Sequence, residues 1–267
     1  RGHAEGQAIS HTNTHVTAAD KVVVGSGGDT TLDGAVISAP RIEGDVQGDL
    51  HIESLQDRAS YHERSRQAGG SVSFGANAGG ASFSSGATDI HSEYASVTEQ
   101  SGMRAGDGGF DVRVKGKTVL KGGAITSTQA ALEEGRNHFA SDGGVELQDV
   151  QNEASYKASG WSVNAGVYAS DKKSPDGSPV LGQDGKPVQE VSRPSGAGWG
   201  EDKGSASSTT KAGISGIAGD KDARTGDAQS GISPIFDKEK VKDEVEAQVD
   251  ITQGFGQQAV PAWRDYA

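Results

Sequence analysis

Leu50-His51-Ile52-Glu53-Ser54-Leu55 and Val145-Glu146-Leu147-Gln148-Asp149-Val150 decide the fold, because they are two copies of one pattern. At an offset of 95 residues their apolar positions coincide, and each copy continues into Ala-Ser-Tyr. Each copy follows a glycine-containing Val/Ile run and precedes an alternating small and apolar run. A duplicated cassette of this kind, at about 28–88 and 116–168, predicts a repeat architecture in which successive units stack.

Composition favours a thin, elongated core. Only 33% of the 267 residues are hydrophobic, and 40 are glycine, which is too lean for a compact enzyme of this length. The balance of 25 basic and 37 acidic residues gives a net charge of −12, which disfavours nucleic acid as a partner. There is no cysteine, which excludes disulfides and thiolate chemistry.

Short strands separated by glycine-rich turns run through the first 170 residues, as at 22–24, 32–37 and 50–55. No stretch of helical periodicity separates them, which argues against βαβ units. We therefore expect an all-β fold over 1–170, a right-handed parallel β-helix with extruded hairpins. Coils of about 20 residues would stack into a rod roughly 40 Å long.

Two alternating runs, 69–88 and 161–168, indicate hairpins that leave this rod at a corner. Exposed apolar alternation can mark a partner surface; the alternative is a hairpin packed against its own rod. The candidate partner-contact residues are Val72, Phe74, Phe83, Trp161, Val163 and Tyr168.

Residues 171–230 change in composition. Prolines and Gly/Ser/Thr runs predict a weakly ordered linker, in which Asp184-Gly185 could form a type I′ hairpin. Residues 231–267 are expected to form a helical segment, with the helix itself capped by Asp237 and ended by Gly254. One face of this helix is apolar and is predicted to dock, through Val241, Val245, Val249 and Phe255.

Each motif that could carry chemistry lacks part of its required pattern or context. Gly116-Lys117-Thr118 resembles the end of a phosphate-binding loop, but the required earlier glycine is Asp111. The run 106–112 resembles one calcium-binding turn, yet such sites need tandem copies, and a plain glycine corner is favoured. His11 and His15 have the spacing of a helical metal pair but no helical context, and His51 has no outstanding local partner. We therefore expect no catalytic, cofactor or metal residue.

The C-terminal region carries a resemblance to a known family. Gly213-Ile214-Ser215-Gly216-Ile217-Ala218-Gly219-Asp220-Lys221 and Pro234-Ile235-Phe236-Asp237, with the helix that follows, accompany the duplicated cassette. Together they resemble the large filamentous-haemagglutinin-type exoproteins of Gram-negative bacteria. The two C-terminal stretches resemble the part of contact-dependent growth inhibition effectors that ends the haemagglutinin repeats, just upstream of a pretoxin region.

The resemblance implies an internal segment of a secreted protein that is associated with the outer membrane at the cell surface. Its implied partners are an outer-membrane two-partner-secretion transporter, the target-cell surface, and a downstream toxin with its immunity protein. The expected function is non-enzymatic presentation and delivery of that toxin to neighbouring bacteria. Two alternatives remain: a cargo-free adhesin that binds host cells or glycans, and a β-helical polysaccharide lyase.

Overall fold

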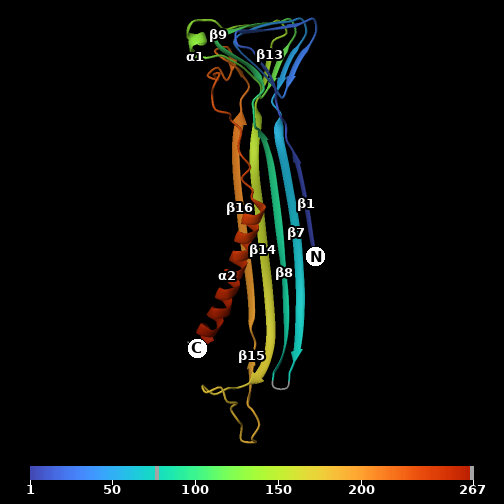
Figure 1. Ribbon diagram of the computed structural model, residues 1–267, viewed down its shortest axis with the longest axis vertical. Helices are drawn as coiled ribbons and strands as arrows, with labels where there is room; N and C mark the ends of the chain where they lie inside the picture. Colours follow the sequence, from blue (N-terminus) through green and yellow to red (C-terminus); the bar gives the residue numbers. More distant parts are fainter. Residues whose placement is uncertain (76–77, 265–267) are drawn as a thin grey trace.

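The chain folds into two connected parts. The computed structural model describes residues 1–75 and 78–264, with side chains of the last helix described as far as Gly254. Short strands wind into a parallel β-helix at one end of an elongated molecule, and a sheet of long antiparallel strands extends from it (Figure 1). We call this second part the lateral sheet.

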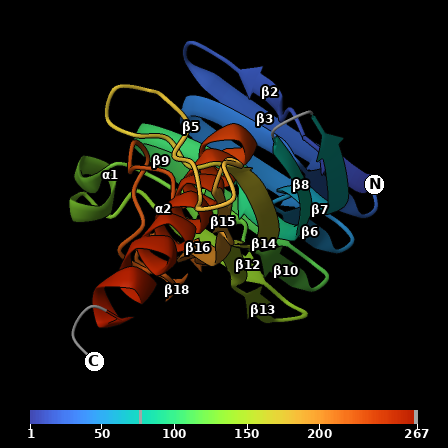
Figure 2. The ribbon, with the colours of Figure 1, turned by 90° about the horizontal axis from the view of Figure 1, so that it is seen from below.

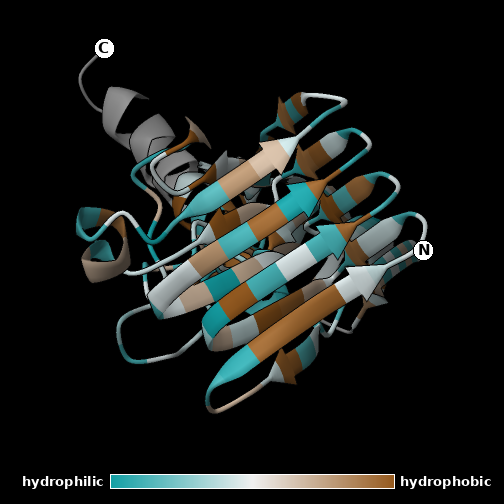
Figure 3. Ribbon diagram, turned by 90° about the horizontal axis from the view of Figure 1, so that it is seen from above, coloured by the Kyte–Doolittle hydropathy of each residue, from teal (hydrophilic) through white to brown (hydrophobic). Residues whose placement is uncertain are grey.

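Each coil of the β-helix contributes strands to three parallel stacks, whose outer strands show alternating hydrophilic and hydrophobic residues (Figure 3). The first stack contains β2 (Thr14–Thr17), the first half of β5 (Ala35–Val46), the first half of β9 (Gly102–Val114), β11 (Ala124–Thr126) and β17 (Gly213–Ile214). The second contains β3 (Lys21–Ser26), the second halves of β5 and β9, and β12 (His138–Ser141). The third contains β4 (Thr30–Asp33), β6 (Leu50–Glu53), β10 (Thr118–Lys121) and β13 (Val145–Gln148). A short helix, α1 (Gln129–Glu133), interrupts the fourth coil, and β18 (Ala218–Gly219) pairs with β17.

The strand register confirms the predicted coil length. Lys21 pairs with Arg41 and Thr30 with Leu50, so one coil takes 20 residues at both positions. The rod is nevertheless shorter than predicted. Five strands in the first stack, about 4.8 Å apart, give a length of roughly 20 Å. The residues assigned to further coils form the lateral sheet instead.

The duplicated cassette occupies equivalent places two coils apart. Ile52 and Leu147 pair with the same residue, Leu120, from opposite sides of β10. Ile52 and Leu120 are fully buried, in a core that also contains Ile42, Met103, Phe110 and Ile125. The repeat in sequence therefore encodes every second coil.

A glycine stands at an equivalent corner of each cassette, Gly34 between β4 and β5 and Gly122 between β10 and β11. Gly34 and Gly122 both have φ +58°, a left-handed conformation that glycine adopts without strain. A Cβ atom on Gly34 would lie 2.8 Å from Leu55 Cδ1, and one on Gly122 would lie 2.8 Å from Val150 Cγ2. Leu55 and Val150 are the matching last apolar residues of the two cassettes.

The lateral sheet grows from the coil ends that follow these cassettes. After β6 the chain leaves as β7 (Gln56–Phe74) and returns as β8 (Ala78–Val97). After β13 it leaves as β14 (Val150–Asp171) and returns as β16 (Ser195–Thr210). β14 pairs antiparallel with β8 and β16, while β15 (Gln189–Ser192) extends the far end and β1 (Gly2–Ile9) forms the opposite edge. The predicted hairpin at 69–88 thus runs from 56 to 97, roughly 60 Å at about 3.3 Å per residue.

The prediction of a weakly ordered linker over 171–230 is wrong for its central part. Residues 195–210 form β16, which pairs with β14 from Ala165↔Ser195 to Val150↔Thr210 without a break. Small residues, which composition alone assigns to a linker, pack here beneath a helix. Asp184-Gly185 does lie in a tight turn, but only Gly185 has positive φ, so the turn is not type I′.

The C-terminal helix is longer than expected. Asp237 Oδ1 accepts hydrogen bonds from the amides of Glu239 and Lys240, both at 3.1 Å, as predicted for the cap. The helix, α2 (Lys238–Arg264), continues through Gly254 instead of ending there. Among the described residues no helix is long and apolar enough to cross a membrane.

Candidate partner surface on the lateral sheet

The lateral sheet is a single layer whose two faces differ. Residues paired across the strands share a face, and the register puts Glu63, Ile90 and Ala158 on one side. α2 packs on this side, which we call the helix-covered face. The opposite side, which contains the pair Ala87 and Trp161, is the open face.

The helix-covered face receives three of the four predicted docking residues of α2. Val241 and Val245 are 3% and 0% exposed and pack with Ile90 and Ala158. Val249 lies near Gly160, where an added Cβ would come 3.4 Å from its Cγ2. Burying each of the two inner valines contributes about 1.5–3 kcal/mol. The side chain of Phe255 lies outside the described residues.

β16 and α2 approach each other closely at Gly198 and Gly200. A Cβ on Gly200 would lie 2.5 Å from the carbonyl oxygen of Val245. Gln248 Oε1 accepts a hydrogen bond from the amide of Glu201, and Thr252 Oγ1 accepts one from Trp199, both at 2.9 Å. The helix therefore satisfies amides on the edge of β16 that faces away from β14, and this protects an open sheet edge (Figure 2).

A buried carboxylate fixes the start of α2. Glu63, 7% exposed, accepts hydrogen bonds from the hydroxyl of Tyr61 at 2.5 Å and from Lys242 Nζ at 3.2 Å. The Tyr61 hydrogen bond lowers the pKa of Glu63, Lys242 lowers it further, and burial opposes both. Phe236, just before the helix, packs against the rings of Tyr61 and Tyr156, with centroids 5.5 and 5.9 Å away.

The open face has no covering element in the described part of the chain, and it collects most of the predicted partner-contact residues. Val72, Phe74, Phe83, Trp161 and Val163 all point to this face, with exposures from 37% for Val163 to 91% for Phe74. These residues form one surface across β7, β8 and β14. Val72 on β7 pairs with Ala81 on β8, and Ala81 pairs with Val167 on β14.

One predicted residue lies elsewhere, and others were missed. Tyr168 is on the helix-covered face, where its ring fills the space above Gly80 and Gly166. Val167 and Trp199, 48% and 68% exposed, lie on the open face, with Trp199 directly opposite Trp161. We define the open patch as seven exposed large apolar residues of this face: Val72, Phe74, Phe83, Trp161, Val163, Val167 and Trp199. The alternation Gly196-Ala197-Gly198-Trp199-Gly200 was the overlooked signal.

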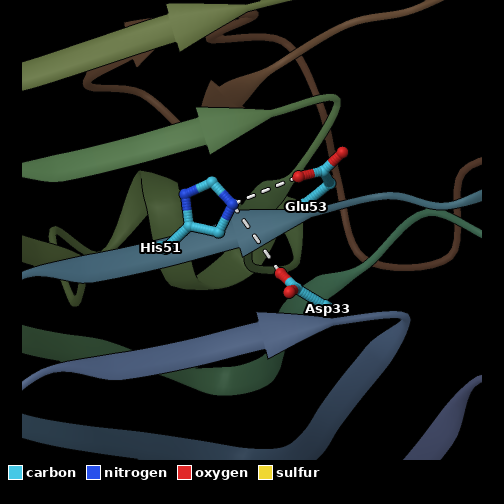
Figure 4. A group of neighbouring side chains, drawn as sticks. All are labelled: Asp33, His51 and Glu53. Carbon is cyan, nitrogen blue, oxygen red and sulfur yellow. Dashed lines mark hydrogen bonds and ion pairs between the residues drawn. The ribbon is translucent and has the colours of Figure 1, made fainter.

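A polar cluster sits on the outer surface of the third stack (Figure 4). His51 Nε2 lies 3.3 Å from Glu53 Oε2 and 3.7 Å from Asp33 Oδ1. The expectation that His51 lacks a local partner is therefore wrong. Glu53 is two residues further along the same strand, and side chains at i and i+2 share a face.

The other sequence motifs lie at corners, at turns or in ion pairs. The run 106–112 crosses the corner within β9, where a Cβ on Gly108 would lie 2.7 Å from the carbonyl oxygen of Pro40. Lys117 ends the turn that leads into β10, and its amide donates to Asp49 Oδ1 at 2.7 Å. His11 and His15 face different carboxylates, Asp57 and Glu99.

Comparison with known proteins identifies the family of the chain. A family model described as Hemagglutinin repeat matches residues 1–70. The tRNA nuclease CdiA of Yersinia mollaretii is 32% identical over 95% of the chain. The chain belongs to the CdiA-like, filamentous haemagglutinin-type proteins. Toxin CdiA of Escherichia coli is 34% identical over 96% of the chain, and Deoxyribonuclease CdiA of Yersinia pseudotuberculosis is 32% identical over 97%.

The CdiA-like chain spans only a small part of these relatives. It corresponds to 8% of the Yersinia mollaretii and Escherichia coli proteins and to 24% of the Yersinia pseudotuberculosis protein. No solved structure matches it.

Proposed function

We propose that the chain is a non-enzymatic stalk and delivery segment of a secreted cell-surface filament, which presents a C-terminal toxin to neighbouring bacteria. Similarity to relatives named as nucleases and toxins along nearly the whole chain supports this role. The shape supports it too, because a β-helix carrying a long lateral sheet holds distant parts of a protein apart.

The proposal includes the partners of the whole filament. An outer-membrane two-partner-secretion transporter would export it, and the filament would stay associated with the producing cell's outer membrane. The toxin would follow this segment and would be neutralised in the producing cell by its immunity protein. The segment itself would meet the surface or outer membrane of the target cell.

The open patch is the observation that carries the delivery role. Single-layer sheets normally bury their apolar face against another layer. Here Phe74, Trp199 and Val72 are 91%, 68% and 65% exposed on one face of a sheet that projects from the rod. An exposed apolar area of this kind marks a contact surface. We assign that contact to the target cell.

A competition experiment tests this assignment. Producer cells display the parent protein with Trp161→Ser and Trp199→Ser and are grown with susceptible cells. We expect inhibition to be lost while surface display, measured with an antibody, stays at the wild-type level. Val23→Ser is the matched control, because Val23 is 64% exposed but lies on the β-helix. Undiminished inhibition by the double tryptophan variant would contradict the delivery role of this face.

A cargo-free adhesin is the second candidate, and the same open patch favours it. Purified chain would then bind host cells or glycans directly, and the double tryptophan variant would not. Binding of the purified chain to host cells but not to bacteria would favour the adhesin over the delivery segment.

A further inference from the structure

The cluster of Asp33, His51 and Glu53 plays no part in the proposed delivery role. The three residues project from the outer surface of β4 and β6, two neighbouring strands of the third stack (Figure 4). Their side chains are between a quarter and a half exposed, so an ion from solvent can reach them. The paired backbones, with Asp33 opposite Glu53 and Thr31 opposite His51, hold the side chains in fixed register.

The register creates a local excess of negative charge. Asp33 and Glu53 lie directly opposite each other, an arrangement of like charges that destabilises a sheet unless a cation compensates it. Lys121 Nζ binds Glu53 Oε1 at 2.7 Å from the far side and leaves Oε2 facing His51. Among the ion pairs between described residues, Asp33 pairs only with His51, whose imidazole is charged only when protonated.

The distances from His51 Nε2 to its two carboxylate neighbours are close to the ligand spacing around a tetrahedral metal ion. The three ligand atoms all lie within 4.8 Å of one another, and the two distances from His51 Nε2 are 3.3 and 3.7 Å. Zinc bonds to nitrogen and oxygen of about 2.0–2.2 Å imply tetrahedron edges of about 3.3–3.6 Å. An ion placed between the three atoms would meet bonding distances after small side-chain rotations, with no change in the backbone.

We propose that Asp33, His51 and Glu53 form a binding site for a divalent transition-metal ion, with Zn²⁺ as the best fit. One imidazole nitrogen and two carboxylate oxygens suit Zn²⁺, whereas Ca²⁺ takes six to eight oxygen ligands. The fourth position faces solvent and would hold water. The bound ion would link the first coil to the second next to the corner where the first hairpin leaves the rod.

Calorimetric titration of the purified chain with ZnCl₂ at neutral pH tests the proposal. We expect one saturable site, and both His51→Ala and Asp33→Asn should weaken its binding at least tenfold. His15→Ala is the matched control, because His15 Nε2 lies 3.0 Å from Glu99 in a similar His–carboxylate pair, whose glutamate is also held by Arg104. It should bind like wild type.

A second readout separates a built site from scattered histidine binding. Co²⁺ in a tetrahedral site gives an intense visible absorption, which wild type should show and His51→Ala should lose. Circular dichroism must show that both variants keep the wild-type β spectrum, as expected for changes on an outer surface. Absence of saturable binding, or wild-type affinity in His51→Ala, would overturn the site.

Discussion

Gly200 should decide whether α2 stays docked on the lateral sheet. A Cβ atom added there would lie 2.5 Å from the carbonyl oxygen of Val245 and 2.9 Å from Gln248 Cβ. The first distance is one that real Cβ atoms essentially never show, and both neighbours belong to the helix. Gly200→Ala must therefore push α2 away from β16.

The energetic consequence follows from what α2 loses on displacement. The burial of Val245 is worth about 2 kcal/mol. The hydrogen bonds that Gln248 and Thr252 accept from the β16 amides of Glu201 and Trp199 are worth about 1 kcal/mol each. A loss of about 4 kcal/mol is large for one helix docked on a sheet, so we expect α2 to detach while the sheet persists.

Amide hydrogen exchange resolves this outcome by region. In wild type the α2 amides should be protected, and Gly200→Ala should remove this protection without changing β14 or the β-helix. Gly69→Ala is the control, because Gly69 lies on the same face and its added Cβ would meet only Ser84 Oγ, at 3.4 Å. If α2 amides of Gly200→Ala exchange as slowly as those of wild type, the glycine contact does not hold the helix.

Three further outcomes follow from the structure. Glu63→Gln should lower the free energy of unfolding at neutral pH. The stability from a lowered carboxylate pKa is lost as pH falls through the folded-state pKa, so the difference in stability between wild type and variant should vanish in acid. Urea unfolding at several pH values measures this difference, and its persistence in acid would contradict the expectation. Ile52→Ala should cost about 3 kcal/mol on unfolding, whereas Val145→Ala, at a residue 40% exposed, should cost under about 1 kcal/mol; equal costs would contradict the assigned core. Limited proteolysis should first cut the mostly exposed loop 172–188, and a first cut within β16 would show that 195–210 is not a paired strand.

The β-helix was predictable from sequence because its signal is local. Val/Ile runs separated by glycines report strands and corners, and the cassette offset reports equivalent coils. Its length was not predictable, because a strand such as β7 reads the same whether it turns into the next coil or leaves the rod. Only the pairing of β8 with β14, across more than 50 residues of sequence, reveals the lateral sheet.

The candidate surface was predicted in part for the same reason. Alternation placed Val72, Phe83 and Trp161 on one face, since period 2 is visible in sequence. Trp199 was missed because glycine and serine compose both flexible linkers and strands that pack beneath a helix. Tyr168 was grouped with these residues, although its odd separation from Trp161 and Val163 places it on the other face of a regular strand.

A cysteine pair across the two excursions tests the central claim, that hairpins from coils two apart pair into one sheet. The chain has no cysteine, so Ser85→Cys with Val163→Cys introduces the only two thiols, at positions directly opposite each other on the open face. We predict that mild oxidation forms an intramolecular disulfide in the folded chain. The control combines Ser85→Cys with Asn164→Cys, one residue out of register and on the opposite face, and it should not cross-link. Cross-linking of the control but not of the in-register pair would contradict the lateral sheet.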